Sequence, residues 1–217
     1  MSNITIVIPC RAGSTRVKNK NFKPFHNSTL LDIKVEQAKG LGLPVVVNSD
    51  SHVAKKIAKD NNIEFVQRPD YYASSECINS EYYEYIANSV DTEFIMILQP
   101  TAPLLENSTV VEAYDFFLEN LDKYDSLVTA DYLKTFVFYN DKPLNYKLDK
   151  MPNSQDLNPI VIPTFNIMIC KVSELLKAKN VITKKCYFYE INQLESMEID
   201  TPIQFEIAEV LYARKNK

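Results

Sequence analysis

Short apolar runs recur along the chain, separated by segments in which apolar residues follow a helical spacing. The first run, at residues 4–8, is almost entirely β-branched and predicts a buried parallel strand that ends at Pro9. Similar runs predict strands at 44–47, 63–66, 94–98 and 126–130. Helical patterns lie at 30–39, 53–60 and 79–90, and a further one follows Ser108. The chain therefore alternates strand and helix over most of its length.

Two of the predicted helices begin with capping signals. Thr201 stands before Pro202 and Gln204, so that threonine is the N-cap, proline the first helical residue and glutamine the third, as in a capping box. Ser108 is expected to cap the helix that follows it. These signals place the start of the last helix directly after the polar segment 196–200.

Repeated strand–helix units with short connections predict an α/β fold with a mostly parallel, doubly wound sheet and helices on both faces. No Gly/Ser-rich or Pro-rich linker divides the 217 residues, so we expect one domain over residues 1–217. Folds of this class bind ligands at the carboxyl ends of their strands. Candidate chemistry is therefore sought in the segments that follow predicted strands.

The stretch 132–163 interrupts this alternation. It is rich in Tyr, Phe, Lys, Asn and Pro and follows neither a strand nor a helix period. We expect an inserted arm that serves in dimerisation or as a lid over an acceptor, and its aromatic residues would then face a second subunit. An ordinary surface excursion fits the sequence equally well. The aromatic residues in question are Phe136, Phe138, Tyr139 and Tyr146.

Composition narrows the classes of function. The formal net charge of −4 argues against nucleic-acid binding through bulk charge. No apolar stretch is long enough to span a membrane, and the N-terminal apolar run is too short for a signal peptide, so a cytoplasmic location is expected. The four cysteines lie far apart without a C-x-x-C pair, which indicates reduced thiols rather than zinc ligands. They are Cys10, Cys77, Cys170 and Cys186.

Positive charge is concentrated after the first predicted strand. Residues 1–31 contain no Asp or Glu but carry several cations, namely Arg11, Arg16, Lys18, Lys20 and Lys23. Small residues in the same turn would let backbone N–H groups approach a phosphate, although the G-K-[ST] ending of a Walker A loop is missing. The segment predicts a site for an anionic small molecule. A solvated basic loop is the alternative.

A second candidate is the acidic pair Glu198 and Asp200. In an extended segment, residues two apart point to the same side, so both carboxylates would converge while Ile199 turns to the core. A pair of oxygen ligands suits Mg²⁺, which also takes waters and substrate phosphate oxygens. An exposed acidic segment end is the alternative interpretation.

Taken in order, these segments resemble the acylneuraminate cytidylyltransferase family, also called CMP-sialic acid synthetases. The family's I-P-A-R-x-G-S-K-R…K-N opening is similar to residues 8–16 followed by 20–21, and its S-T-D segment is similar to residues 48–50. Its later R-P, Q-P-T-S-P and D-x-D motifs are similar to residues 68–69, 99–103 and 198–200. The resemblance spans nearly the whole chain, in register.

The resemblance implies a nucleotide-diphospho-sugar transferase-like fold and a role for each matching residue. The residues expected to bind CTP are Arg11, Ala12, Gly13, Ser14, Lys20, Asn21, Arg68, Gln99 and Thr101. Arg68 would sit near the cytidine, and Gln99 and Thr101 between nucleotide and acceptor. The catalytic residues would be Arg11, Lys20 and Asp200, and Mg²⁺ would be held by Asp200 and Glu198.

The implied reaction is the transfer of CMP from CTP to a small acidic sugar, with release of pyrophosphate, by a homodimeric enzyme. In-line attack of an acceptor hydroxyl needs positioning and charge neutralisation rather than a nucleophilic side chain. Two alternatives remain. One is a cytidylyltransferase for a phosphorylated or polyol acceptor, and the other is a noncatalytic relative that binds a nucleotide or a partner.

Three departures from the family pattern concern the metal and the acceptor. Glu198 replaces the first Asp of D-x-D, which lengthens that ligand by one methylene. The family's R-R-Q run is replaced by residues 153–158, which lack both arginines, and Phe165 stands where a glycine is expected. We therefore expect an acceptor other than ordinary sialic acid. Candidate replacement cations are Lys134, Lys142, Lys147 and Lys150.

Overall fold

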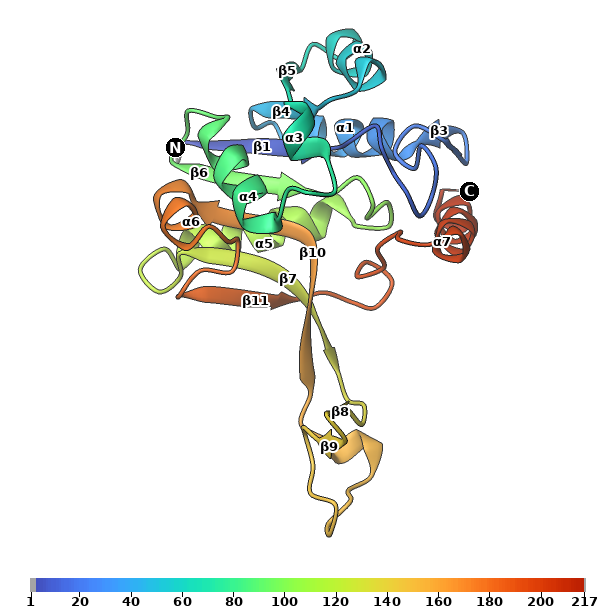
Figure 1. Cartoon of the computed structure of the whole chain (residues 1–217), viewed down its shortest axis with the longest axis vertical. Coiled ribbons are helices and arrows are strands. Elements are labelled where there is room, and N and C mark those ends of the chain that lie inside the picture. Colours follow the sequence, from blue (N-terminus) through green and yellow to red (C-terminus); the bar gives the residue numbers. More distant parts are fainter. Residues whose placement is uncertain (1–2, 217) are drawn as a thin grey trace.

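The computed structural model describes residues 3–216 and shows a seven-stranded sheet in the order β11-β7-β10-β6-β1-β4-β5 (Figure 1). Neighbouring strands pair in parallel except β10, which runs antiparallel to both β6 and β7. The strands are β1 Ile4–Pro9, β4 Val45–Ser49, β5 Glu64–Gln67, β6 Phe94–Leu98, β7 Ser126–Leu133, β10 Ile160–Lys171 and β11 Cys186–Glu190. The α/β class with a mostly parallel sheet is confirmed.

Helices cover both faces of this sheet. They are α1 Leu30–Gly40, α2 His52–Asp60, α3 Asp70–Ala73, α4 Asn79–Asn88, α5 Asn107–Glu119, α6 Val172–Ala178 and α7 Pro202–Lys215. Residues of α1, α2 and α5 pack on one face in one apolar cluster, and residues of α4 and α6 pack on the other. Strand β1 serves both clusters, because Ile4, Ile6 and Ile8 face the first and Val7 the second. Within residues 3–216, no helix is long and apolar enough to cross a bilayer.

Helix α7 lies beside the sheet rather than on it, against a third apolar cluster. Phe205 and Ala208 of this helix are buried there with Val17 and Ile199, and Phe25 meets Phe205 edge to face at 5.3 Å. Thr201 caps the helix, with Gln204 completing the capping box, as predicted. A cap of this kind contributes about 1 kcal/mol. The cluster therefore ties the basic segment after β1 to the acidic segment before α7.

The segment between β7 and β10 leaves the body as a long arm (Figure 1). The two strands continue their antiparallel pairing outward, where Leu133 pairs with Ile160. The tip holds the short strands β8 Phe138–Tyr139 and β9 Lys142–Pro143, and the 3₁₀ turn η1 Ser154–Asp156 follows. The protrusion agrees with the expected insertion, whereas its role as a dimerisation arm or lid stays a prediction.

Several strands and helices were not predicted from the sequence. Strand β10 begins inside the stretch without period, and β11 and α6 follow in a region for which no element was predicted. The prediction that Ser108 caps α5 is wrong. Glu106 occupies the N-cap position in an extended conformation, and its carbonyl accepts the N–H of Val110 at 3.2 Å. No side chain completes this cap, because the Glu106 carboxylate pairs with Lys215 at 2.8 Å.

Two further small strands close a tight turn before α1. They are β2 Pro24–Phe25 and β3 Ser28–Thr29, which pair in an antiparallel manner. Thr29 then caps α1 by accepting the N–H of Asp32 at 3.1 Å. This turn connects the basic segment to helix α1, which packs on the sheet.

Candidate functional site

A cleft of about 400 Å³ opens at the carboxyl ends of β1, β5 and β6, where parallel α/β sheets place their ligand sites. It is lined by the end of β1, the basic segment after it, the residue after β5, the segment after β6 and the acidic pair before α7. The lining residues are Pro9, Cys10, Arg11, Ser14, Thr15, Arg16, Lys20, Asn21, Arg68, Asn79, Tyr82, Gln99, Pro100, Thr101, Glu198 and Asp200.

The basic segment is shaped by contacts at both of its ends. At the start, the backbone N–H of Ala12 donates to the Asp50 carboxylate, at 2.8 Å, and Asp50 follows β4. In the middle, Val17 is buried in the cluster beneath α7. At the end, the carbonyl of Asn21 accepts the N–H of Leu31 in α1, at 3.1 Å. Of the five cations of this segment, Arg11, Arg16 and Lys20 line the cleft, whereas Lys18 and Lys23 do not.

The acidic pair behaves as its spacing predicts. Ile199 is fully buried, whereas Glu198 and Asp200 both line the cleft. The N–H of Ile199 donates to the carbonyl of Thr101 at 2.9 Å, and the Thr101 hydroxyl donates to the Glu198 carboxylate at 2.9 Å. The segment after β6 therefore positions one of the two carboxylates directly.

The second carboxylate meets the cations of the basic segment. Asp200 Oδ1 lies 2.8 Å from Arg16 Nη2 and 3.4 Å from Lys20 Nζ. The Lys20 ammonium also donates to the carbonyl of Ile199. Burial lowers the pKa of Lys20, an effect opposed by the charge of Asp200. Two cations of the basic segment thus share one carboxylate of the acidic pair in the cleft.

Partial burial acts on Glu198 in the opposite sense. It raises the pKa of the Glu198 carboxyl, and the hydrogen bond from Thr101 offsets part of that rise. A cation brought to this carboxylate would favour its ionised form. A positively charged partner would therefore stabilise the ionised Glu198 carboxylate.

Arg68, which follows β5, also lines the cleft. Its side chain is only 4% exposed and is held by Asn48 of β4 and by the Tyr82 hydroxyl of α4. Beside it lies a second hollow of about 410 Å³, which shares Arg68, Tyr82 and two more residues with the cleft. This hollow is lined by Arg11, Arg68, Tyr72, Ser74, Ser75, Cys77, Asn79 and Tyr82. It carries no carboxylate.

The structure brings most of the sequence-predicted site residues together. All those expected to bind the nucleotide line the cleft except Ala12 and Gly13. The N–H of Ala12, which was expected to face a phosphate, donates to Asp50 instead. The roles of the assembled residues in binding stay predictions.

Other features of the site were missed or only partly recognised in the sequence. Asn79 and Tyr82 come from the first turns of α4, in a stretch that carries no recognisable motif. Asn48 was noted only as part of residues 48–50, which are similar to the family's S-T-D segment, although its side chain accepts a hydrogen bond from Arg68. Arg16 was visible in the basic segment, but only the fold shows that it meets Asp200. Sequence position alone gives no sign of these pairings.

The residues in the cleft fit Mg²⁺. Within residues 3–216, no group of three or more His, Cys, Asp or Glu side chains forms a ready-made metal cage. Two carboxylates with the rest of the coordination left to water and phosphate is the arrangement that Mg²⁺ favours. Glu198 and Asp200 are the candidate ligands, and Arg16 and Lys20 would have to release Asp200 for it to bind the ion.

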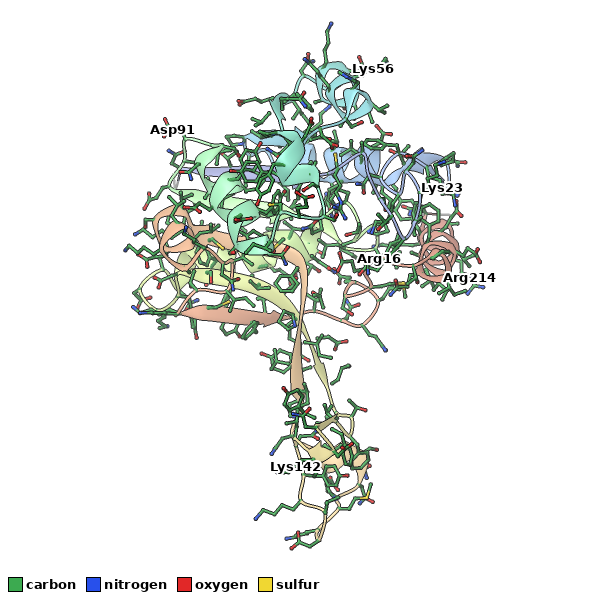
Figure 2. All side chains as sticks on the ribbon, in the orientation of Figure 1. Arg16, Lys23, Lys56, Asp91, Lys142 and Arg214 are labelled. Atoms are coloured by element: carbon green, nitrogen blue, oxygen red, sulfur yellow. The ribbon has the colours of Figure 1, made fainter. Side chains whose placement is uncertain are left out.

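The residues expected to shape the acceptor side lie outside the cleft. The four candidate lysines belong to the arm, where Lys134 donates to the carbonyl of Gln155 at 2.8 Å. Figure 2 shows Lys142 on the arm and Arg16 beside the segment that leads into α7. Phe165 lines a separate hollow of about 240 Å³, which shares only Asn79 with the cleft. It adopts a left-handed conformation, with φ of 56°, at a bulge in β10.

Comparison with known sequences gives one family. A family model described as "Cytidylyltransferase" matches residues 5–216. The chain is 25% identical to an N-acylneuraminate cytidylyltransferase of Escherichia coli O18:K1:H7, over all of this chain and 54% of that protein. It is 26% identical to a pseudaminic acid cytidylyltransferase of Campylobacter jejuni, over 98% of this chain and 97% of that protein. It thus spans about half the length of the first relative and nearly all of the second.

Among solved structures, the fold is similar to that of CMP:2-keto-3-deoxy-manno-octonic acid synthetase complexed with CTP. The TM-score is 0.70, and the alignment covers 99% of this chain and 100% of that chain at 13% sequence identity. At this identity the likeness shows the fold alone. The cleft described above lies on a scaffold that is shared with that structure.

Proposed function

The chain belongs to the cytidylyltransferase family of nucleotidyltransferase enzymes, and from this premise we propose that it transfers CMP from CTP to a nonulosonic, sialic-acid-like sugar acid with the help of Mg²⁺. The acceptor hydroxyl oxygen forms a bond to the α-phosphorus as it loses its proton. The bond from that phosphorus to the bridging oxygen of the β-phosphate breaks, and pyrophosphate leaves. The products are the CMP-sugar and pyrophosphate.

The observation that carries the proposal is the meeting of cations and carboxylates from distant segments in one cleft. Arg11, Arg16 and Lys20 from the segment after β1 face Glu198 and Asp200 from the segment before α7. A triphosphate needs neutralising cations, and its metal needs oxygen ligands close by. An anionic ligand without a metal would not require the two carboxylates.

We expect the protein's own side chains to position most of the nucleotide. Arg11 also contacts the carbonyl of Ala73 in α3, at 3.4 Å, and so lies between the charged cleft and the carboxylate-free hollow. We infer that the triphosphate lies toward Lys20 and Arg16 and that the base lies toward Arg68. Fixed cations along the triphosphate would stabilise the charge that moves to the leaving pyrophosphate.

Mg²⁺ would be held by Asp200 and Glu198, and when bound it would neutralise phosphate oxygens and orient them for in-line attack. Thr101 would keep the Glu198 carboxylate directed into the cleft through the hydrogen bond seen here. Lys20 and Arg16 would be released from Asp200 toward the phosphates. The same cations would thus pair with Asp200 before binding and with the nucleotide afterwards.

The sugar-acid acceptor is supported by the relatives, which are named for N-acylneuraminate and pseudaminic acid. The missing arginines indicate that the acceptor carboxylate, which every sugar acid of this class carries, would be held by other cations, because arginine is the side chain that matches a carboxylate in bidentate fashion. The arm lysines would provide cations to the site of a second copy in a homodimer. Legionaminic and pseudaminic acids are the acceptor classes that we favour.

The test is a pyrophosphate-release assay with purified protein, MgCl₂, CTP and one acceptor at a time. We expect release with CTP and pseudaminic or legionaminic acid, weaker release with N-acetylneuraminate, and none when EDTA replaces MgCl₂. CTP binding without turnover of any of these acids would favour a phosphorylated or polyol acceptor. Absence of CTP binding would favour the noncatalytic interpretation.

A further inference from the structure

Residues 99–106, which connect β6 to α5, form a mostly buried segment without strand or helix. Ala102 is fully buried and Leu105 is only 4% exposed. Pro100 and Pro103 have no N–H, so the segment cannot make the regular hydrogen bonds of a strand or a helix. Its buried carbonyl groups therefore need donors from elsewhere in the fold.

Two side chains of α1 supply such donors. Lys34 Nζ donates to the carbonyl of Ala102 at 3.0 Å. Gln37 Nε2 donates to the carbonyl of Leu105 at 2.9 Å. Lys34 and Gln37 are three positions apart, so they lie on the same face of the helix, and Lys34 Nζ also donates to Gln37 Oε1 at 2.5 Å. The pair therefore fastens the segment 99–106 to α1 at two points.

Lys34 is an unusual residue for this position. It is fully buried, and none of the ion pairs within residues 3–216 involves it. Lysine is almost never buried in this way without a counter-ion. An apolar side chain would fill the space without burying an amine, but it would leave the carbonyl of Ala102 without this donor. The hydrogen bond is therefore the feature that distinguishes lysine from an apolar residue here.

The segment that α1 holds in turn holds the acidic pair. The carbonyl of Thr101 accepts the N–H of Ile199, and the Thr101 hydroxyl donates to the Glu198 carboxylate, both at 2.9 Å. Thr101 directly precedes Ala102 in the chain. Only one peptide unit therefore separates the residue that Lys34 holds from the residue that contacts Glu198.

We propose that Lys34 and Gln37 are positioning residues, which set the Glu198 carboxylate at the place where it binds Mg²⁺. Neither of them lines the cleft, and both act through Thr101. The inference rests on the proposed function, in which Glu198 is a ligand of Mg²⁺. It adds a group of residues behind the cleft that the reaction depends on.

A glutamate ligand has a particular need for this support. Its side chain has one more rotatable bond than aspartate, so it loses more conformational freedom when it binds an ion. Mg²⁺ also tolerates little deviation from octahedral geometry. A fixed Thr101 hydroxyl restricts the Glu198 side chain before the ion binds, whereas a segment that shifts would not. Partners that hold a metal ligand from behind commonly change metal affinity about 10- to 100-fold when they are mutated.

The test measures the dissociation constant of CTP by calorimetry, once in MgCl₂ and once in EDTA, and it needs no acceptor. The ratio of the constant in EDTA to the constant in MgCl₂ is the metal enhancement, which we expect to be at least about 30-fold in the wild type. Lys34→Met removes the donor and keeps an unbranched side chain. We expect the metal enhancement to fall about fivefold in this variant. The constant in EDTA should stay within about twofold of the wild type, because the cations of the cleft are unchanged.

A double-mutant cycle tests whether Lys34 acts through Thr101. Thr101→Val removes the hydroxyl that contacts Glu198, and we expect the metal enhancement to fall about tenfold. In the double variant the enhancement should lie within about twofold of that in Thr101→Val alone, since the hydroxyl through which the lysine acts is already absent. A combined loss equal to the product of the two single losses would contradict this route.

Two further variants separate positioning from a general loss of structure. Val35→Ala shortens the next residue of α1, which is 1% exposed and packs in the apolar cluster on the sheet. It should lower stability to urea, as Lys34→Met does, but leave the metal enhancement within about twofold of the wild type. Gln37→Leu removes the donor to Leu105 and one acceptor of Lys34, and the enhancement should fall about threefold. This variant serves as the test if Lys34→Met does not fold.

The inference and the proposed function fail differently. If the metal enhancement is the same in the wild type, Lys34→Met and Gln37→Leu, the positioning role is wrong while the proposed nucleotide and metal site stands. If the wild type binds CTP equally well in MgCl₂ and in EDTA, or does not bind CTP, the proposed function is wrong and the inference fails with it.

Discussion

Asp200 is the residue at which the charges of the cleft meet. Its Oδ1 contacts two cations, and its N–H is held by the Gln204 side chain at 2.8 Å. Asp200→Asn keeps the shape of the side chain and removes its charge. We expect pyrophosphate release to fall at least about 100-fold, because the charge that we propose to hold Mg²⁺ would be lost. The rate is measured with saturating CTP and acceptor.

In Asp200→Asn the affinity for CTP should respond differently from the rate of pyrophosphate release. Freed from Asp200, Arg16 and Lys20 remain available to phosphate, so CTP binding without metal should not weaken. Asp60→Asn is the matched control, since Asp60 forms only an exposed pair with Lys56, at 2.8 Å. Turnover of Asp200→Asn near the wild-type rate would contradict the assigned role.

Lys34 is a fully buried lysine outside the cleft. Its ammonium lies 3.0 Å from the carbonyl of Ala102 and 2.5 Å from Gln37 Oε1, and burial lowers its pKa to about 7. Lysine in the unfolded chain keeps its proton up to its ordinary pKa of 10.5. Between these values the unfolded state binds more protons, so the free energy of unfolding rises with pH.

We therefore expect Lys34→Met to flatten the dependence of stability on pH. The wild type should gain up to about 1.4 kcal/mol per pH unit above pH 7 from this group, and the variant should lose that gain. Urea unfolding at several pH values between about 6 and 9 measures the slope. Lys56→Met, at an exposed lysine, is the control. Equal slopes in wild type and Lys34→Met would show that Lys34 remains protonated in the fold.

At the scale of elements, the arm is the feature that departs most from a doubly wound fold. Phe136 and Phe138 pack against Tyr146, with ring centroids 5.1 and 5.9 Å apart, so part of the expected aromatic set is used within the arm. Tyr139 and Leu148 remain 67% and 70% exposed. Large apolar side chains that stay exposed on a protrusion indicate a surface for another protein.

We expect the wild type to sediment as a dimer and a variant without the arm to sediment as a monomer. Residues 136–157 would be replaced by a short glycine-rich turn, which leaves the pairing of Leu133 with Ile160 intact. The double change Tyr139→Ser and Leu148→Ser is a milder variant that keeps the arm. A monomeric wild type, or a truncated protein that is still dimeric, would contradict the dimerisation role.

Sequence patterns identified the elements whose periodicity is local. Strands β1 and β6 and helices α1 and α7 follow from runs and caps within a few residues, because strand and helix periods are set by neighbouring side chains. Strand β10 did not follow, since half of it lies in the arm and lacks a buried face. The left-handed conformation of Phe165 in the bulge of β10 was also not predicted, because glycine is the residue that usually signals such a conformation.

At the scale of the whole molecule, the site depends on contacts between residues far apart in the chain. Arg16 and Asp200 are separated by 184 positions and Thr101 and Glu198 by 97. The parallel sheet brings these segments to one edge, and the apolar cluster beneath α7 brings the last segment against the first. The cleft therefore depends on how the fold arranges these segments in space as well as on the motifs within each segment.

The sequence by itself determined the fold class, the family and most of the side chains that line the cleft, because these are written in local periods and short motifs. Tertiary structure decided how the side chains pair. In the folded protein the Ala12 N–H donates to Asp50, and Asp200 pairs with Arg16 and Lys20. Arg68 donates to Asn48 and to Tyr82. Hydrogen bonds and ion pairs act over a few ångströms, so their partners are fixed only when packing brings distant segments together.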